Sequence, residues 1–152
     1  MEQFIELGRI FQHLRHWFAG IGSMCYNGFM IKKLTEAECR AAMESGDFDP
    51  AMLKGPAAAI ILTQSWCPQW KAMKSYLPKA EEAVRALYGE ISIYYIEYDI
   101  EPWESLENDA FMRFKENTYN NREIPYVRYY RDGVYARDSN YISLDGFINR
   151  LQ

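Results

Sequence analysis

Among the three cysteines, Cys67 has the sequence context most typical of a reactive thiol. It lies in the segment Trp66-Cys67-Pro68-Gln69-Trp70, between an apolar run and a helical pattern. The start of a helix offers unpaired N–H groups and the positive end of the helix dipole, which favour a thiolate, the nucleophilic form of cysteine. The alternative is a buried structural thiol, because free cysteine is among the most buried residue types. Cys67 is therefore the candidate nucleophile.

The other cysteines and the two histidines predict no second chemical centre. Cys39 falls inside a predicted helix and Cys25 in a glycine-rich segment, and neither forms a Cys-x-x-Cys pair with Cys67. The three cysteines also lack the spacing of a zinc site, and an odd count does not suit a disulfide scaffold. His13 and His16 are three residues apart, but no third ligand is near them in sequence. The sequence predicts neither a metal centre nor a bound cofactor.

The composition excludes several classes of function. The net charge is -4, and lysine and arginine form no cluster of the kind that phosphate contacts need, so a nucleic-acid partner is not expected. No apolar run approaches the roughly 18 residues that a membrane-spanning helix needs. Residues 1–3 lack the basic start of a secretory signal. These features predict a cytoplasmic protein with reduced thiols and no transmembrane segment.

Strands and helices alternate around Cys67. The run 57–62 is continuously apolar, as expected of a strand buried on both faces. Residues 68–88 carry a helical stripe, with Pro68 suited to the first turn and Pro78 implying a kink. The other predicted elements are strand 29–34, helix 35–45, strand 91–99, helix 103–116, the hairpin 126–137 and helix 144–151. This order indicates an α/β fold with a mixed sheet, in which a parallel core is extended by an antiparallel hairpin.

Local signals mark the ends of several elements. Thr35 and Glu38 match a capping box at the start of a helix. The turn 131–133, which contains Gly133, separates two runs of β-forming residues and predicts a hairpin. Ser143 is a candidate cap for the last helix. These signals agree with the alternating order.

The amino-terminal segment predicts an additional amphipathic helix over residues 3–18. Its apolar stripe consists of Phe4, Leu7, Phe11, Leu14 and Phe18. Such a stripe is rarely left in water, so it should dock on the domain or on a second copy, which would give a homodimer. Glycines make 20–28 a linker. We therefore divide the chain into an amino-terminal extension, 1–28, and a domain, 29–152.

The chain resembles the thioredoxin superfamily, and three features carry the resemblance. Trp66-Cys67 after an apolar strand is similar to the family's Trp-Cys-x-x-Cys turn. Ile124-Pro125 before a hairpin strand is similar to the family's cis-proline loop. The third feature is the order of elements, and Lys71 matches a lysine that the family often has. The resemblance implies a thioredoxin-like fold, with a central mixed sheet flanked by helices.

By this resemblance, Cys67 matches the attacking cysteine and Pro125 the cis-proline beside it. Trp66, Pro68, Trp70 and Ile124 would join Pro125 in lining a substrate groove, with Trp66 shielding one side of the sulfur. Three departures from the family pattern stand out. Trp70 replaces the resolving cysteine, Ile61 replaces a buried aspartate, and Pro68-Gln69 replaces the usual Gly-Pro.

Two classes of function follow from these departures. In the first, the protein is a monothiol thiol-disulfide oxidoreductase: Cys67 forms mixed disulfides with protein thiols, and a second thiol such as glutathione, or Cys25 at a distance, resolves them. In the second, the fold is a redox-inactive binding or adaptor module that takes an extended peptide beside Pro125. The acidic and aromatic segment 97–109 favours a basic protein partner over anionic glutathione. The sequence leaves both classes open.

Overall fold

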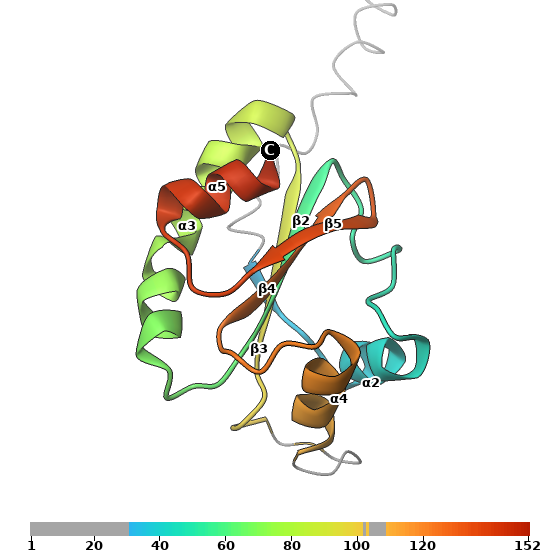
Figure 1. The fold of residues 1–152 in the computed structure, drawn as a ribbon. Coiled ribbons are helices and arrows are strands. Elements are labelled where there is room, and N and C mark those ends of the chain that lie inside the picture. The colour runs from blue at the N-terminus through green and yellow to red at the C-terminus, as the bar shows by residue number, and fades with distance from the viewer. Residues whose placement is uncertain (1–30, 102, 104–108) are drawn as a thin grey trace, which may run out of the picture.

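The computed structural model describes residues 31–101, 103 and 109–152. The predicted helix 3–18, the linker 20–28, the boundary between 28 and 29, and Cys25 lie outside the described residues. Figure 1 shows the described chain as one central sheet with helices on both of its faces.

The sheet has five strands in the order β1-β3-β2-β4-β5. β1 (Ile31–Lys33) and β2 (Ala57–Thr63) each pair with β3 (Ile91–Glu97) in parallel. β4 (Tyr126–Arg131) and β5 (Val134–Ser139) form the antiparallel hairpin, and β4 pairs antiparallel with β2. The predicted mixed sheet is therefore correct, and every residue of the central strand β2 is buried.

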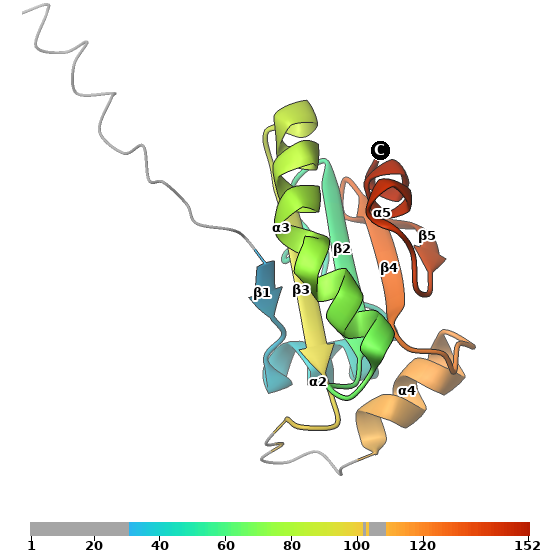
Figure 2. The same ribbon diagram turned by 90° about the vertical axis from the view of Figure 1, so that its left-hand side faces the viewer.

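Helices cover the two faces of the sheet in pairs. α3 (Pro68–Tyr88) and α5 (Leu144–Leu151) lie on one face, whereas α2 (Glu36–Ser45) and α4 (Ala110–Thr118) lie on the other (Figures 1 and 2). Because side chains of a strand point alternately to opposite faces, β2 contributes residues to two separate cores. Ala57, Ala59 and Ile61 pack with α3 and α5, and Ala58, Ile60 and Leu62 pack on the opposite side.

The predicted caps and turn are present. Thr35 and Glu38 form a complete capping box, and Ser143 accepts a hydrogen bond from the amide of Gly146 at the start of α5. Asp132 and Gly133, the two residues between β4 and β5, both have positive φ, as a two-residue hairpin turn requires. Pro78 lies within α3, and Figure 2 shows the direction of this helix changing part-way along its length.

One helix begins later than the sequence predicts. The prediction placed a helix from residue 103, but α4 starts at Ala110 and Trp103 is not helical. The Trp103 ring lies 6.0 Å from that of Phe111, and its indole nitrogen donates to the carbonyl of Tyr98. Trp103 packs from a loop onto the start of α4, and its apolar character at that spacing was interpreted as part of the helix. The predicted strands 29–34 and 91–99 end earlier than expected, at Lys33 and at Glu97.

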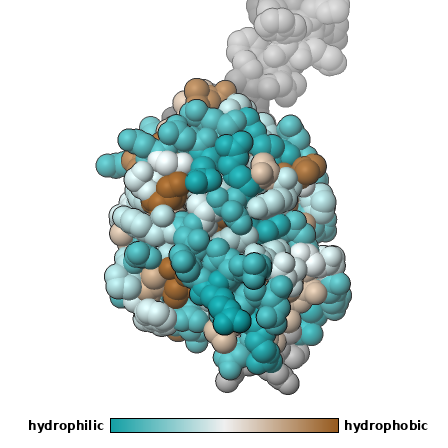
Figure 3. Space-filling model, in the orientation of Figure 1, coloured by the Kyte–Doolittle hydropathy of each residue, from teal (hydrophilic) through white to brown (hydrophobic). Residues whose placement is uncertain are grey.

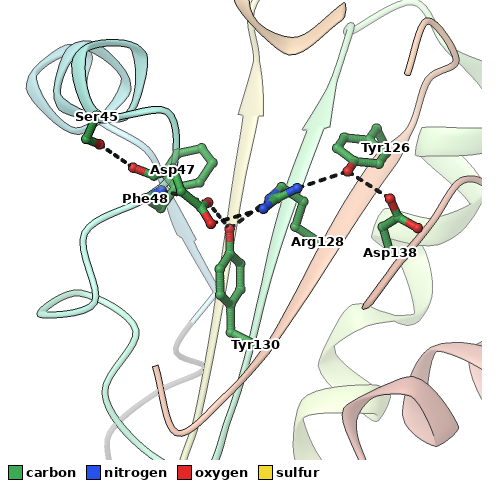
Figure 4. A network of polar contacts seen from close by, with 7 residues as sticks. All are labelled: Ser45, Asp47, Phe48, Tyr126, Arg128, Tyr130 and Asp138. Carbon is green, nitrogen blue, oxygen red and sulfur yellow. Dashed lines mark hydrogen bonds and ion pairs between the residues drawn. The ribbon is translucent and has the colours of Figure 1, made fainter. Parts of the chain in front are cut away.

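A polar network crosses the face of the sheet that α2 and α4 cover (Figure 4). The guanidinium of Arg128, on β4, donates to the Tyr126 and Tyr130 hydroxyls and forms an ion pair with Asp47 at 3.0 Å. Tyr126 in turn donates to Asp138 of β5. The Arg128 guanidinium also lies 3.9 Å from the ring centre of Tyr119. The network ties the segment after α2 to the hairpin.

The face of the molecule in Figure 3 is mostly hydrophilic. On the face that Figure 3 shows, hydrophobic residues form small separate spots rather than one continuous patch. The large hydrophobic side chains that are exposed come from α3, β5 and several loops: Trp66, Leu87, Ile100, Val134, Tyr135 and Tyr141. Among the described residues, no helix is both long and apolar enough to cross a membrane.

Candidate functional site

Cys67 stands at the junction of β2 and α3. It is the N-cap residue of α3, with φ -66° and ψ 117°, and its carbonyl accepts the first helical hydrogen bond from the amide of Lys71. Pro68 occupies the first turn, where the missing N–H of proline is not needed. The order strand, tight turn and helix N-terminus is therefore the arrangement that the sequence predicted.

The sulfur of Cys67 faces the loop that precedes β4. The thiol donates a 3.7 Å hydrogen bond to the carbonyl oxygen of Ile124, and the Ile124–Pro125 peptide bond is cis. Fifty-seven residues separate Cys67 from Ile124 in the chain, so only the antiparallel pairing of β2 with β4 brings them together. The structure thus joins the two motifs that carry the resemblance.

Cys67 is nevertheless largely covered. Only 4% of the residue is exposed, whereas the adjacent Trp66 is 61% exposed. The Cys67 side chain makes no capping hydrogen bond to α3 within the described part of the chain. The expected contact of sulfur with the first amides of the helix is therefore replaced by the contact with the Ile124 carbonyl.

The loop before Cys67 is held from two sides. Ser65 donates through both its amide and its hydroxyl to the carboxylate of Asp99, each at 2.6 Å. The indole nitrogen of Trp66 donates to the side-chain oxygen of Gln64, also at 2.6 Å. These bonds fix the approach to Cys67. Gln64 and Ser65 were not predicted as site residues, although their position between a buried strand and a helix start was a usable signal.

Trp70, in the place of the resolving cysteine, is fully buried. Its indole nitrogen donates a 2.6 Å hydrogen bond to Glu97 Oε1, and its ring lies 5.4 Å from that of Tyr95. Lys74 Nζ lies 3.4 Å from the same carboxylate oxygen. Trp70 is therefore a packed core residue with a satisfied polar group.

Glu97 was predicted only as part of the acidic segment 97–109, and not as a neighbour of the Cys67 turn. It ends β3, directly beside Thr63 at the end of β2. Because the carboxyl ends of parallel strands meet at one edge of a sheet, a polar residue there lies close to whatever follows the neighbouring strand. That position was the signal that could have linked Glu97 to the turn around Cys67.

The other candidate thiols lie elsewhere. Cys39 is buried in the core between the sheet and α2, and burial raises the pKa of its thiol to about 12. This is the structural role that the sequence predicted for it. Cys25 lies outside the described residues. The residues that the structure describes contain no group of three or more His, Cys, Asp or Glu side chains able to hold a metal ion.

Solved thioredoxins share this architecture at low sequence identity. Oxidised thioredoxin O2 from Arabidopsis thaliana matches 76% of this chain and 86% of its own length, with a TM-score of 0.51 and 14% identity. Oxidised mitochondrial thioredoxin 3 from Saccharomyces cerevisiae matches 80% of this chain and 92% of its own, with a TM-score of 0.51 and 16% identity. Trxlp from Edwardsiella tarda matches 80% and 97%, with a TM-score of 0.51 and 14% identity. No protein-family model and no curated protein sequence matches the chain.

The fold is therefore thioredoxin-like, as the sequence resemblance implied. At identities of 14–16%, the similarity establishes the fold of this chain and does not establish its chemical activity. What this chain does must be argued from Cys67 and its surroundings.

Proposed function

We propose that this thioredoxin-like protein exchanges thiols and disulfides through the single thiol of Cys67. One observation carries the proposal: the Cys67 sulfur, at the start of α3, lies 3.7 Å from the carbonyl that precedes Pro125. A nucleophilic sulfur beside a backbone loop is suited to a disulfide presented by an extended chain, because that chain can pair with the loop while its sulfur meets Cys67.

The exchange needs two steps. The Cys67 thiolate attacks one sulfur of a disulfide, a new S–S bond forms, and the other sulfur leaves as a thiolate that takes up a proton. A second thiol then attacks the mixed disulfide, and Cys67 departs with the electron pair of the broken S–S bond. Because Trp70 replaces the internal resolving thiol, the second thiol comes from outside the Cys67 turn: from glutathione, from the substrate protein, or from Cys25.

The surroundings of Cys67 favour a protein substrate. Glu97, Asp99 and Glu101 follow one another at the carboxyl end of β3, and Asp99 bonds directly to the loop before Cys67. Lys74 and Lys33 form ion pairs with Glu97 and Glu101, so the Asp99 carboxylate is the group at this edge that would repel anionic glutathione and attract basic segments of proteins. A reducing compartment such as the cytoplasm suits a single thiol of this kind.

Alkylation and adduct formation test the proposal. At neutral pH, iodoacetamide should label Cys67 at least tenfold faster than Cys39, because the Cys39 thiol is buried and its pKa is raised to about 12. Incubation with a disulfide-linked peptide dimer should give a mixed disulfide at Cys67 that persists until a thiol is added, as measured by mass spectrometry. Cys67→Ser is the blank for both assays, and Cys25→Ser shows whether Cys25 resolves the adduct.

A second candidate function is a redox-inactive module that binds an extended peptide beside Pro125. The 4% exposure of Cys67 favours it, because a covered sulfur is poorly accessible to a disulfide. In that case Cys67 would label no faster than Cys39 and no peptide adduct would accumulate. Those two results together would replace the exchange proposal with the binding proposal.

A further inference from the structure

Lys115 is a lysine with no exposed surface. It lies on α4, and burial lowers the pKa of its amino group. Lysine is almost never fully buried unless a polar partner compensates for the loss of water. Here Nζ donates a 2.8 Å hydrogen bond to the main-chain carbonyl oxygen of Glu123. The side chain therefore reaches from inside the domain to the segment that leads into β4.

The bond from Lys115 ends one residue before the carbonyl that contacts Cys67. Glu123 O accepts from Lys115, and Ile124 O accepts from the Cys67 thiol. On the far side of Ile124, Pro125 O accepts a 3.3 Å bond from Asn140 Nδ2. Three consecutive carbonyls are thus each held by a side chain from a different part of the chain, namely α4, the start of α3 and the segment after β5.

The same segment is held at its start by an amide pair. Asn121 Oδ1 accepts from the amide of Glu123 at 3.0 Å, and the side chains of Asn121 and Asn140 exchange hydrogen bonds at 3.1 and 3.2 Å. Asn140 is partly exposed, so water can replace its bonds. Water cannot replace the buried Lys115 in the same way. Lys115 is therefore the support whose removal should move the segment most.

We propose that Lys115 is a positioning residue of the Cys67 site, which holds residues 123–125 so that the Ile124 carbonyl stays against the Cys67 thiol. The proposal deepens the proposed function, because the same segment would pair with the substrate. With Lys115 in place, the sulfur stays covered until a chain docks beside Pro125. Without it, small reagents reach Cys67 more easily, while a docked peptide meets a displaced segment.

Lys115→Met tests this directly, since it keeps the length and bulk of the side chain and removes the donor. In the full-length protein, alkylation of Cys67 by iodoacetamide should become at least threefold faster, and formation of the mixed disulfide with a peptide dimer at least threefold slower. Cys39 reports general loosening, because it is buried on the face of the sheet opposite to that of Cys67 and labels only when the fold opens.

The controls separate positioning from loss of stability. Ile91→Val removes one buried methylene at the opposite end of β3 and should leave both Cys67 rates within twofold of the wild type. Lys115→Arg restores a donor and should return both rates toward the wild-type values. If Lys115→Met does not fold, Lys115→Gln, whose amide is too short to span the same distance, takes its place with the same readouts.

The outcomes are distinct. Unchanged Cys67 alkylation in a folded Lys115 variant overturns the proposal, as does faster labelling of Cys67 that Cys39 follows in step. If the wild type forms no peptide adduct yet Lys115→Met still exposes Cys67 selectively, the exchange function fails and the positioning role stands. Opposite changes in the two Cys67 rates support both.

Discussion

The cores on the two faces of the central sheet differ in the kinds of side chain that they contain. Under α3 and α5, the core is largely aliphatic, and its one fully buried indole, Trp70, has its polar group satisfied by Glu97. Under α2 and α4, aromatic rings are more frequent than on the first face, and two cations, Arg128 and Lys115, are buried in or beside them. The first face carries the candidate nucleophile, and the second holds the loop that faces it.

The candidate nucleophile therefore lies on one face, and the bonds that hold the loop opposite it come from the other face. Ile124 packs against both cores, so the carbonyl opposite Cys67 lies at the boundary between them. On the aliphatic side, the burial of apolar side chains is the main stabilisation of α3, and the bond from Trp70 to Glu97 adds to it. The other side relies on directional bonds, from Arg128 to Asp47 and from Lys115 to Glu123, which fix the position of loops as well as their burial. Breaking each side in turn should therefore give different results.

The largest loss of stability should come from the aliphatic side. Trp70→Ala removes a fully buried indole and leaves the Glu97 carboxylate without its donor. We expect the free energy of unfolding to fall by about 3–5 kcal/mol, as measured by urea denaturation. Trp66→Ala is the matched control, four residues away and 61% exposed, and should change it by less than about 0.5 kcal/mol. Equal effects would refute the buried role of Trp70.

On the α2 and α4 face, Asp47→Asn should lower the free energy of unfolding somewhat less than Trp70→Ala does. The substitution leaves the buried Arg128 guanidinium with no carboxylate, but Asp47 itself is partly exposed, which moderates the effect. We expect a loss of about 2–4 kcal/mol in the free energy of unfolding. Asp138→Asn, which changes an acceptor of the Tyr126 and Tyr135 hydroxyls at the exposed rim, should lower the free energy of unfolding by about 1 kcal/mol. If the two variants are equally mild, Asp47 does not anchor the network.

Alkaline pH should weaken both sides together. Burial raises the pKa of Tyr98, on the α2 and α4 side, and of Tyr129, on the α3 and α5 side, to about 12. A raised pKa means that the folded state keeps its proton longer than the unfolded chain. The stability that this contributes is full below the unfolded pKa of about 10 and is lost as pH rises toward 12.

At pH 11 each tyrosine should therefore account for roughly 1–2 kcal/mol of lost stability. Urea denaturation at pH 9 and 11 measures the loss, and Tyr129→Phe should lose less between these two pH values than the wild type. A variant with the same alkaline loss as the wild type would show that Tyr129 titrates without linkage to folding.

The smallest effects should be the same on both faces. Thr35→Ala removes the cap of α2, and Ser143→Ala removes the cap of α5. Each should lower the free energy of unfolding by about 1 kcal/mol, because an N-cap acts on its own helix and not through the core beneath it. Ser75→Ala, at an exposed position inside α3, is the control and should be nearly neutral. A large difference between the two cap variants would show that one cap also supports packing.

Patterns of local physical origin were readable from the sequence. The continuous apolar run of β2, the capping box at Thr35 and the turn at Gly133 each depend on neighbouring residues, and all three are present. The helix predicted from residue 103 was wrong at its start because Trp103 packs on Phe111 from a loop, and spacing alone does not distinguish that arrangement from a helix. The position of Cys67 at the start of α3 was likewise predicted from neighbouring residues and is present.

By itself, the sequence determined which cysteine begins a helix and the order of the described elements, because these follow from residue type and local spacing. Only the tertiary structure decided that the Cys67 sulfur is covered, that it meets the Ile124 carbonyl, that Trp70 bonds to Glu97, and that Lys115 supports the segment opposite. The contact between Cys67 and Ile124 spans 57 residues of chain, and that between Trp70 and Glu97 spans 27. Contacts of this kind join distant segments that pair across the sheet, and the spacing of residues within one segment does not fix them.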